Sequence, residues 1–208
     1  MEKKAIEVFN GWAQKGRDEG MKKNHFESYV QIKKIIKEEF QGAKNAFLAD
    51  VGCGNGWATE DLLKESFITK AYGYDGAKEM IKNAQKKNHK TNFFHTNLNR
   101  WNPKQKFDII YSMEVLYYLK EPQSFIQQCY KKWLKPNGLF IAGIDYYKEN
   151  KKSHSWPEQL GVSMKIKTCD GWKRELIKSK FNNCKIKIVN KKKDWAGTLI
   201  FWGRKNDL

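Results

Sequence analysis

The chain has 208 residues, of which 40% are hydrophobic and 30% are charged, a balance that predicts one globular domain with its own core. Because no apolar run approaches the roughly 18 residues of a membrane helix, and Met1 to Glu7 mix both charge signs, we expect neither a membrane span nor a signal peptide. A cytoplasmic protein is therefore predicted. The cysteines have no C-x-x-C spacing and no His at ligand spacing, so we expect neither a disulfide framework nor a metal site. They are Cys53, Cys129, Cys169 and Cys184.

The formal net charge of +17 raises the question of a nucleic-acid partner. Residues 146–208 carry 16 basic and 6 acidic side chains, so +10 of the +17 lies in the last third. Arginine is scarce, whereas surfaces that read bases favour its bidentate guanidinium group. A solvated lysine-rich surface is the ordinary interpretation, and a polyanion partner remains the alternative.

A helical leader or lid is predicted for residues 1–45. Asn24 followed by Glu27 resembles a capping box, and an apolar stripe then predicts an amphipathic helix that ends near Gly42. The stripe is formed by Tyr29, Ile32, Ile36 and Phe40. The segment around Trp12 shows no periodicity, so it is interpreted either as a lid over a site or as a terminus with one buried Trp.

Strands and helices are predicted to alternate after the leader. Strands are expected at 46–51, 70–75, 92–95, 107–112, 139–144, 184–189 and 196–202, with helices after Gly56, at 77–84, at 124–134 and at 172–179. A turn is expected at 135–138. This pattern predicts a doubly wound α/β fold with a mostly parallel sheet and a C-terminal antiparallel hairpin. We expect a single domain (1–208) with a cofactor-binding core at 46–146, a substrate-side insertion at 147–168, and a C-terminal helix and hairpin at 169–208.

The glycine-rich stretch after the first strand predicts a ligand-binding turn beside a helix N-terminus. A dinucleotide fingerprint G-x-G-x-x-G fails, because Trp57 stands where the last glycine is required. A phosphate-binding P-loop fails as well, since the Gly-Lys-Ser/Thr ending is missing and Asp50 would repel a pyrophosphate. An acid at this place suits a cationic ligand better.

The stretch Asp50-Val51-Gly52-Cys53-Gly54-Asn55-Gly56 resembles the first motif of class I S-adenosylmethionine-dependent methyltransferases. The resemblance continues with Asp75 at the second-strand acid that holds the ribose hydroxyls, with the fourth strand at 107–110, and with the turn at 134–138. It covers roughly residues 46–146 and implies a seven-stranded Rossmann-like sheet that binds S-adenosylmethionine. Asn97 replaces the usual acid of the third motif.

The cofactor site is expected at the carboxyl ends of the strands. Its predicted residues are Asp50, Gly52, Cys53, Gly54, Gly56, Asp75, Gly76, Thr96, Asn97, Leu98 and Ser112.

The acceptor side is expected around Glu114, Tyr117, Asp145 and Tyr146, which follow the fourth and fifth predicted strands. His25, His95 and His154 are further candidates for a base. An N-P-P-Y sequence of the type used on base nitrogens is absent. Aromatic residues are dense near the expected mouth, namely Trp12, Trp101, Tyr117, Tyr118, Tyr146, Tyr147 and Trp156. These features predict a small-molecule acceptor, with an amine as the favoured class. The alternatives are RNA or a ribosomal protein bound by the basic C-terminal third, and a non-enzymatic cofactor-binding subunit. The oligomeric state is not predicted.

Overall fold

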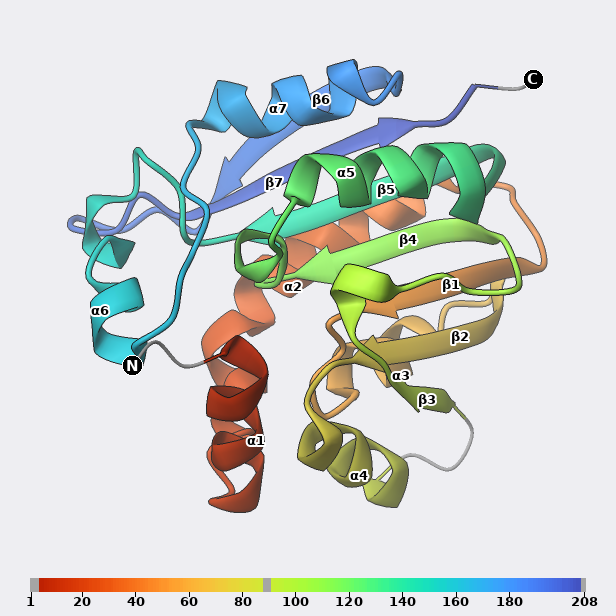
Figure 1. The fold of residues 1–208 in the computed structure, drawn as a ribbon. Coiled ribbons are helices and arrows are strands. Elements are labelled where there is room, and N and C mark those ends of the chain that lie inside the picture. Colours follow the sequence, from red (N-terminus) through yellow and green to blue (C-terminus); the bar gives the residue numbers. More distant parts are fainter. Residues whose placement is uncertain (1–3, 88–90, 207–208) are drawn as a thin grey trace.

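The computed structural model describes residues 4–87 and 91–206. Its strands form one seven-stranded sheet in the order β3-β2-β1-β4-β5-β7-β6, in which β7 is antiparallel to both neighbours (Figure 1). This confirms the predicted doubly wound, Rossmann-like sheet. The strands are β1 (Ala46–Val51), β2 (Ile68–Asp75), β3 (Asn92–His95), β4 (Phe107–Met113), β5 (Leu134–Ile144), β6 (Asn182–Val189) and β7 (Thr198–Arg204).

Helices cover both faces of the sheet because successive strand side chains point to opposite sides. In β1, Leu48 joins an apolar cluster with helices α2 and α3, whereas Ala49 joins the cluster that contains α5 and α7. Both residues are fully buried. The helices are α1 (Ala5–Gln14), α2 (Glu19–Glu39), α3 (Trp57–Leu62), α4 (Lys78–Lys87), α5 (Pro122–Gln128), α6 (Trp156–Leu160) and α7 (Cys169–Lys178), with a π-helical turn at Cys129–Trp133 and 3₁₀ turns at Leu98–Arg100, Leu116–Tyr118 and Lys151–Ser153.

The leader is helical as predicted, but its internal boundaries differ from the prediction. The predicted capping box is wrong, because Asn24 and Glu27 lie inside α2, which begins at Glu19. The helix extends further towards the N-terminus because Asp18, at its start, is buried against the core and accepts hydrogen bonds from Asn55 and Asn83. The residues around Trp12, which showed no periodicity, form α1. The apolar stripe is confirmed, since its four residues are buried in the core.

The predicted turn at 135–138 lies within β5. Leu134 pairs with Phe107 and Leu139 pairs with Ile109, so the turn residues bulge out opposite Asp108. The predicted helix at 124–134 is α5 followed by the π-helical turn. The other predicted strands and helices are present, with boundaries shifted by a few residues.

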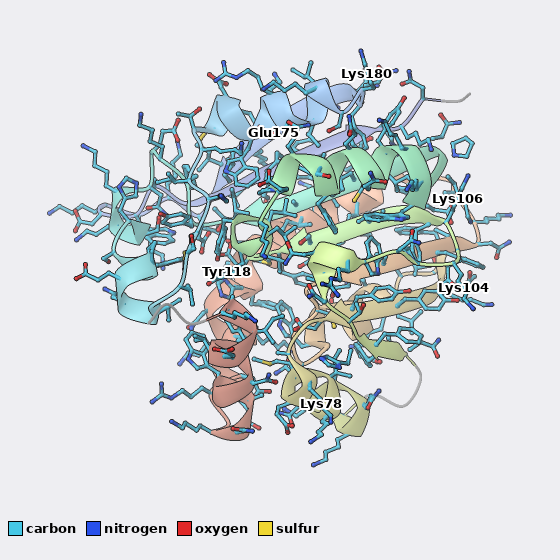
Figure 2. All side chains as sticks on the ribbon, in the orientation of Figure 1. Lys78, Lys104, Lys106, Tyr118, Glu175 and Lys180 are labelled. Atoms are coloured by element: carbon cyan, nitrogen blue, oxygen red, sulfur yellow. The ribbon has the colours of Figure 1, made fainter. Side chains whose placement is uncertain are left out.

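The insertion after β5 contains α6 and lies, with α1, at the end of the sheet to which the parallel strands point (Figure 1). The labelled lysines Lys104 and Lys106 lie near each other at one side of the molecule, whereas Lys78 and Lys180 lie at opposite ends of the view (Figure 2). Among the helices of residues 4–87 and 91–206, none combines the length and apolar character that a membrane span requires.

Candidate functional site

The predicted site residues gather at one edge of the sheet. Since β1 pairs with β2 on one side and with β4 on the other, the sheet order reverses between β1 and β4. Ligands of doubly wound folds bind outside the carboxyl ends of the strands at such a switch point. The glycine turn follows β1, Asp75 ends β2, Glu114 follows β4, and Asp145 follows β5.

The glycine turn requires backbone conformations that other residues rarely adopt. Gly52, Gly54 and Gly56 have φ angles of 84°, 54° and 80°, which lie in the left-handed region favoured by glycine. A Cβ at Gly52 would lie 2.0 Å from a methyl carbon of Val115. The turn therefore depends on glycine both for its backbone angles and for the close approach of the segment after β4.

The carboxylate of Asp75 anchors this turn. Its oxygens accept the backbone N–H groups of Gly54 at 2.9 Å and Ala77 at 2.7 Å. Burial raises the pKa of Asp75, and these two N–H groups partly offset the shift. A carboxylate has about four lone-pair positions, so two remain to accept hydroxyl groups.

Three predicted cofactor residues direct their side chains into the protein. Asp50 is buried and accepts the Thr59 hydroxyl at 2.6 Å, and its burial raises its pKa to about 7. Ser112 donates its hydroxyl to the Val51 carbonyl at 2.8 Å. Cys53 packs its thiol into a small cluster with Ile81, Ala84 and Phe93. These side chains therefore support the strand ends and the turn.

The third motif borders β2 through its backbone. Thr96 donates its N–H to the Asp75 carbonyl, and the Asn97 side chain accepts the N–H of Asn99 and so caps a 3₁₀ turn. Leu98 is buried, and the carbonyl of Gly76 bonds the ring of His95. Asn97 thus keeps a local structural bond at the place where the motif usually has an acid.

The leader lies directly over the glycine turn. The terminal methyl of Met21 is 3.1 Å from the place a Cβ of Gly54 would occupy, and Ile6 is 2.8 Å from the corresponding place at Gly76. Asn55 in the turn donates its side-chain amide to Asp18 at 3.0 Å. Sequence reasoning missed Ile6, Asp18 and Met21, because nothing in their spacing indicates a contact with residues 33 to 70 positions away.

On the other side of the switch point, three titratable side chains meet. One imidazole nitrogen of His25 and one carboxylate oxygen each of Glu114 and Asp145 lie within 4.8 Å of one another. His25 Nδ1 is 3.9 Å from Asp145 Oδ2. Tyr117 donates its hydroxyl to Glu114 at 2.7 Å, and Thr198 donates to Asp145 at 2.6 Å. Oε1 of Glu114 is buried and has no hydrogen-bond partner within the described ranges. We call His25, Glu114 and Asp145 the acidic cluster.

Burial shifts the pKa of every member of the acidic cluster. Burial, followed by the charge of Asp145, raises the pKa of Glu114 well above its usual value, although the Tyr117 hydroxyl opposes the shift. Burial raises the pKa of Asp145 to about 6 and lowers that of His25. Two adjacent buried carboxylates are costly unless a proton or another cation neutralises them. Residues 4–87 and 91–206 place no fourth His, Cys or carboxylate in the cluster.

Aromatic rings connect the acidic cluster to the leader. Tyr117 contacts Tyr118 and Tyr146 with ring centroids 4.5 and 5.5 Å apart, and Tyr118 meets Phe9 of α1 at 5.4 Å. Phe9 in turn contacts Trp12 at 5.3 Å. Figure 2 labels Tyr118 beside the leader. This aromatic wall joins the leader, the segment after β4 and the segment after β5.

Other predicted site residues lie outside this arrangement. Trp101 is buried in the core against Trp133, and Tyr147 donates its hydroxyl to the Gly197 carbonyl. His95 bonds the carbonyl of Gly76, and His154 is exposed and bonds that of Lys148. The contacts of these four residues are with the core or with backbone carbonyls, which gives each of them a structural role.

Comparison with known proteins identifies the domain. The family model for a methyltransferase domain matches residues 49–142, which run from β1 through β5. Residues 49–142 therefore form a class I S-adenosylmethionine-dependent methyltransferase domain. Among curated relatives, it is 27% identical to a malonyl-[acyl-carrier protein] O-methyltransferase of Halalkalibacterium halodurans, over 70% of this chain and 60% of that one. It is 29% identical to a tRNA U34 carboxymethyltransferase of Pseudoalteromonas atlantica, over 51% of this chain and 34% of that one.

Solved methyltransferase structures share the fold over nearly the whole chain. A putative Haloferax volcanii methyltransferase, solved with the Trm112 methyltransferase activator, aligns with a TM-score of 0.80 at 22% identity and covers 95% of this chain and 97% of that one. Magnesium protoporphyrin IX methyltransferase of Synechocystis with bound SAM aligns with a TM-score of 0.67 at 14% identity, over 90% and 83% of the two chains. By contrast, this methyltransferase spans 60% and 34% of the lengths of the two curated relatives named above.

The residues at the strand ends fit the cofactor of this family, S-adenosylmethionine. Asp75 keeps free lone pairs for a ribose diol, and the left-handed glycines leave the backbone open to a close ligand. The leader residues Ile6 and Met21 would border the bound cofactor. S-adenosylmethionine supplies the electrophilic methyl group.

Proposed function

We propose that this methyltransferase transfers the methyl group of S-adenosylmethionine to the amine of a small molecule. The observation that carries the proposal is the pair of buried, adjacent carboxylates of Glu114 and Asp145 at the strand ends beside the cofactor turn. An ammonium group would neutralise them and would satisfy the unpartnered Oε1 of Glu114.

The aromatic wall supports the same class of acceptor. Rings of Tyr117, Tyr118 and Tyr146 adjoin the acidic cluster, and an ammonium over an aromatic face gains about 0.5–2 kcal/mol. Glu114 itself has a φ of 59°, an uncommon backbone conformation for a residue other than glycine or asparagine. Observed strain of this kind is found at functional sites more often than elsewhere.

The chemistry requires positioning and the removal of one proton. The ammonium gives a proton to the carboxylate pair, the nitrogen lone pair then forms the new N–CH₃ bond, and the S–CH₃ bond breaks to leave a thioether. Alignment of the nitrogen with the methyl group can account for roughly 7–11 kcal/mol of the barrier. Glu114 and Asp145 would bind the ammonium and take its proton, while Tyr117 and Tyr146 would orient it.

A panel of amines, thiols, phenols and carboxylates, assayed with labelled S-adenosylmethionine, tests the proposal. We expect methyl incorporation into amines, reduced about 100-fold or more in Glu114→Gln and Asp145→Asn. Glu121→Gln, on the segment leading to α5, serves as the matched control and should retain full activity. Methylation confined to neutral or anionic acceptors would contradict the proposal. Activity that disappears in EDTA and returns with Mn²⁺ would show that the cluster holds a metal ion instead of an ammonium.

RNA or a ribosomal protein is the second candidate acceptor. It is favoured by the excess of basic side chains in residues 146–208 and by the match to a tRNA-modifying relative. Lys185 and Lys187 on the edge strand β6 would contact the polyanion. A steep fall of RNA affinity with salt, together with methyl incorporation into RNA, would favour this candidate over the amine.

A further inference from the structure

The proposed amine chemistry gives no role to one side chain of the acidic cluster, His25. His25 comes from the leader helix α2, whereas Glu114 and Asp145 come from the ends of β4 and β5. The leader therefore contributes a titratable group to the acceptor side, in addition to the residues Ile6 and Met21 that it places over the cofactor turn.

We propose that His25 carries the proton released during methyl transfer from the buried carboxylate pair to solvent. This inference rests on the proposed amine acceptor. Each turnover converts an ammonium into a methylated ammonium and releases one proton. If that proton stayed on the pair, the site could not bind and deprotonate the next ammonium.

Solvent access distinguishes His25 from Asp145 and from the buried Oε1 of Glu114. The side chain of His25 is 26% exposed, whereas that of Asp145 is 10% exposed. His25 Nδ1 lies 3.9 Å from Asp145 Oδ2, so a movement of about 1 Å would bring the two atoms to hydrogen-bond distance. The other oxygen of Asp145 is held by the Thr198 hydroxyl, which leaves Oδ2 to face the imidazole.

The proton affinities of the cluster suit this transfer. Burial raises the pKa of Asp145 to about 6 and lowers that of His25, so both shifts act against the ordinary difference in proton affinity between a carboxylate and an imidazole. Transfer between groups of similar pKa has little uphill cost. A neutral imidazole at pH 7 can accept the proton from Asp145 and give it to water. The groups that face His25 from the neighbouring elements are Asp145 and Glu114, whose other partners are the hydroxyls of Thr198 and Tyr117.

The hydroxyl network behind Asp145 gives the transfer a defined geometry. The Thr198 hydroxyl also bonds that of Ser28 at 2.6 Å, one turn further along α2 than His25. Asn190 donates its side-chain amide to the same Ser28 hydroxyl at 2.9 Å. Through these contacts α2 is bound to the strand that carries Thr198, so His25 and Asp145 are held on connected elements.

His25→Gln tests the relay, because glutamine keeps the size and hydrogen-bonding capacity but does not titrate. With the amine most rapidly methylated in the panel, we expect kcat at pH 7 to fall about 10- to 100-fold. The KM for the amine and the affinity for S-adenosylmethionine should change less than about twofold, and the pH profile of kcat should lose the ionisation of His25. In His25→Ala, added imidazole should restore part of the rate. His154→Gln, which alters an exposed histidine, is the control and should behave as the wild type.

The two proposals fail in different ways. If wild type methylates an amine and His25→Gln keeps its kcat and its pH profile, the relay is wrong and the amine acceptor stands. Loss of activity without imidazole rescue and with a weakened affinity for S-adenosylmethionine would show a structural role for His25, which also overturns the relay. If no amine is methylated, the proposed function fails and the relay fails with it.

Discussion

The carboxylate of Asp75, at the end of β2, accepts the backbone N–H of Gly54, in the turn after β1, at 2.9 Å. Through this bond the two parts of the proposed cofactor site share one side chain. The acid that we propose for the ribose diol also holds the glycine turn in its left-handed conformation. In Asp75→Asn the side-chain NH₂ group would face the backbone N–H of Gly54 or of Ala77, so two donors would meet where a hydrogen bond is now made. We expect the affinity for S-adenosylmethionine to fall at least about tenfold.

Isothermal titration of S-adenosylmethionine into Asp75→Asn measures this loss. Asp194→Asn changes an exposed acid in the turn before β7 and should bind as the wild type does. Unchanged affinity in Asp75→Asn would contradict the role given to this carboxylate.

Gly52→Ala should disrupt the turn. Its Cβ would lie 2.0 Å from a methyl carbon of Val115, and its φ of 84° is unfavourable for alanine. We expect a loss of about 2–4 kcal/mol in the free energy of unfolding, measured by urea denaturation. Gly20→Ala in α2 is the matched control, since a Cβ there meets nothing within 4 Å. It should stabilise the protein by up to about 1 kcal/mol, because alanine favours helix over glycine.

Asp18→Ala should release the leader from the glycine turn. Asp18 accepts the side-chain amides of Asn55 and Asn83 at 3.0 and 3.2 Å, and its removal leaves these donors without that partner. We expect faster proteolytic cleavage within residues 4–18 and weaker binding of S-adenosylmethionine, while the core retains its fold by circular dichroism. Glu19→Ala, at an exposed neighbouring position, should leave both measurements unchanged. Equal cleavage rates in the two variants would argue against this contact as the leader's anchor.

Asp50 should make stability depend on pH. Its pKa is about 7 in the folded protein against an ordinary value of 3.8, so the folded state binds its proton more tightly than the unfolded state does. The contribution of Asp50 to the free energy of unfolding therefore falls as pH rises from about 4 to about 7, by up to about 4 kcal/mol. Other carboxylates have lowered pKa values and change stability in the opposite direction. The quantity to measure is therefore the difference in the free energy of unfolding between wild type and a variant that lacks the Asp50 carboxylate.

Asp50→Asn removes that titration and keeps an oxygen that can accept the Thr59 hydroxyl. The free energy of unfolding of this variant, relative to wild type, should rise between pH 5 and pH 7.5 in denaturant titrations. A difference that is constant over this range would show that Asp50 stays ionised in the folded protein.

Local sequence signals predicted most of the fold. The alternation of apolar strands with amphipathic helices and the glycine motif after the first strand predicted the sheet, its antiparallel end and the cofactor family, since these depend on neighbours in sequence. The boundary of α2 was missed because the burial of Asp18 against Asn55 and Asn83 extends the helix beyond its local capping signal. The turn at 135–138 was recognised, but its place within β5 depends on pairing with β4.

The sequence by itself determined that the first motif and Asp75 lie together, because they end consecutive strands whose carboxyl ends must meet at one edge of a parallel sheet. Only the tertiary structure decided which residues form the acidic cluster. His25 comes from a leader helix about 90 and 120 residues away from Glu114 and Asp145, and no spacing or periodicity encodes a contact across such a distance. The packing of α2 on the sheet brings them together, and burial there shifts their proton affinities.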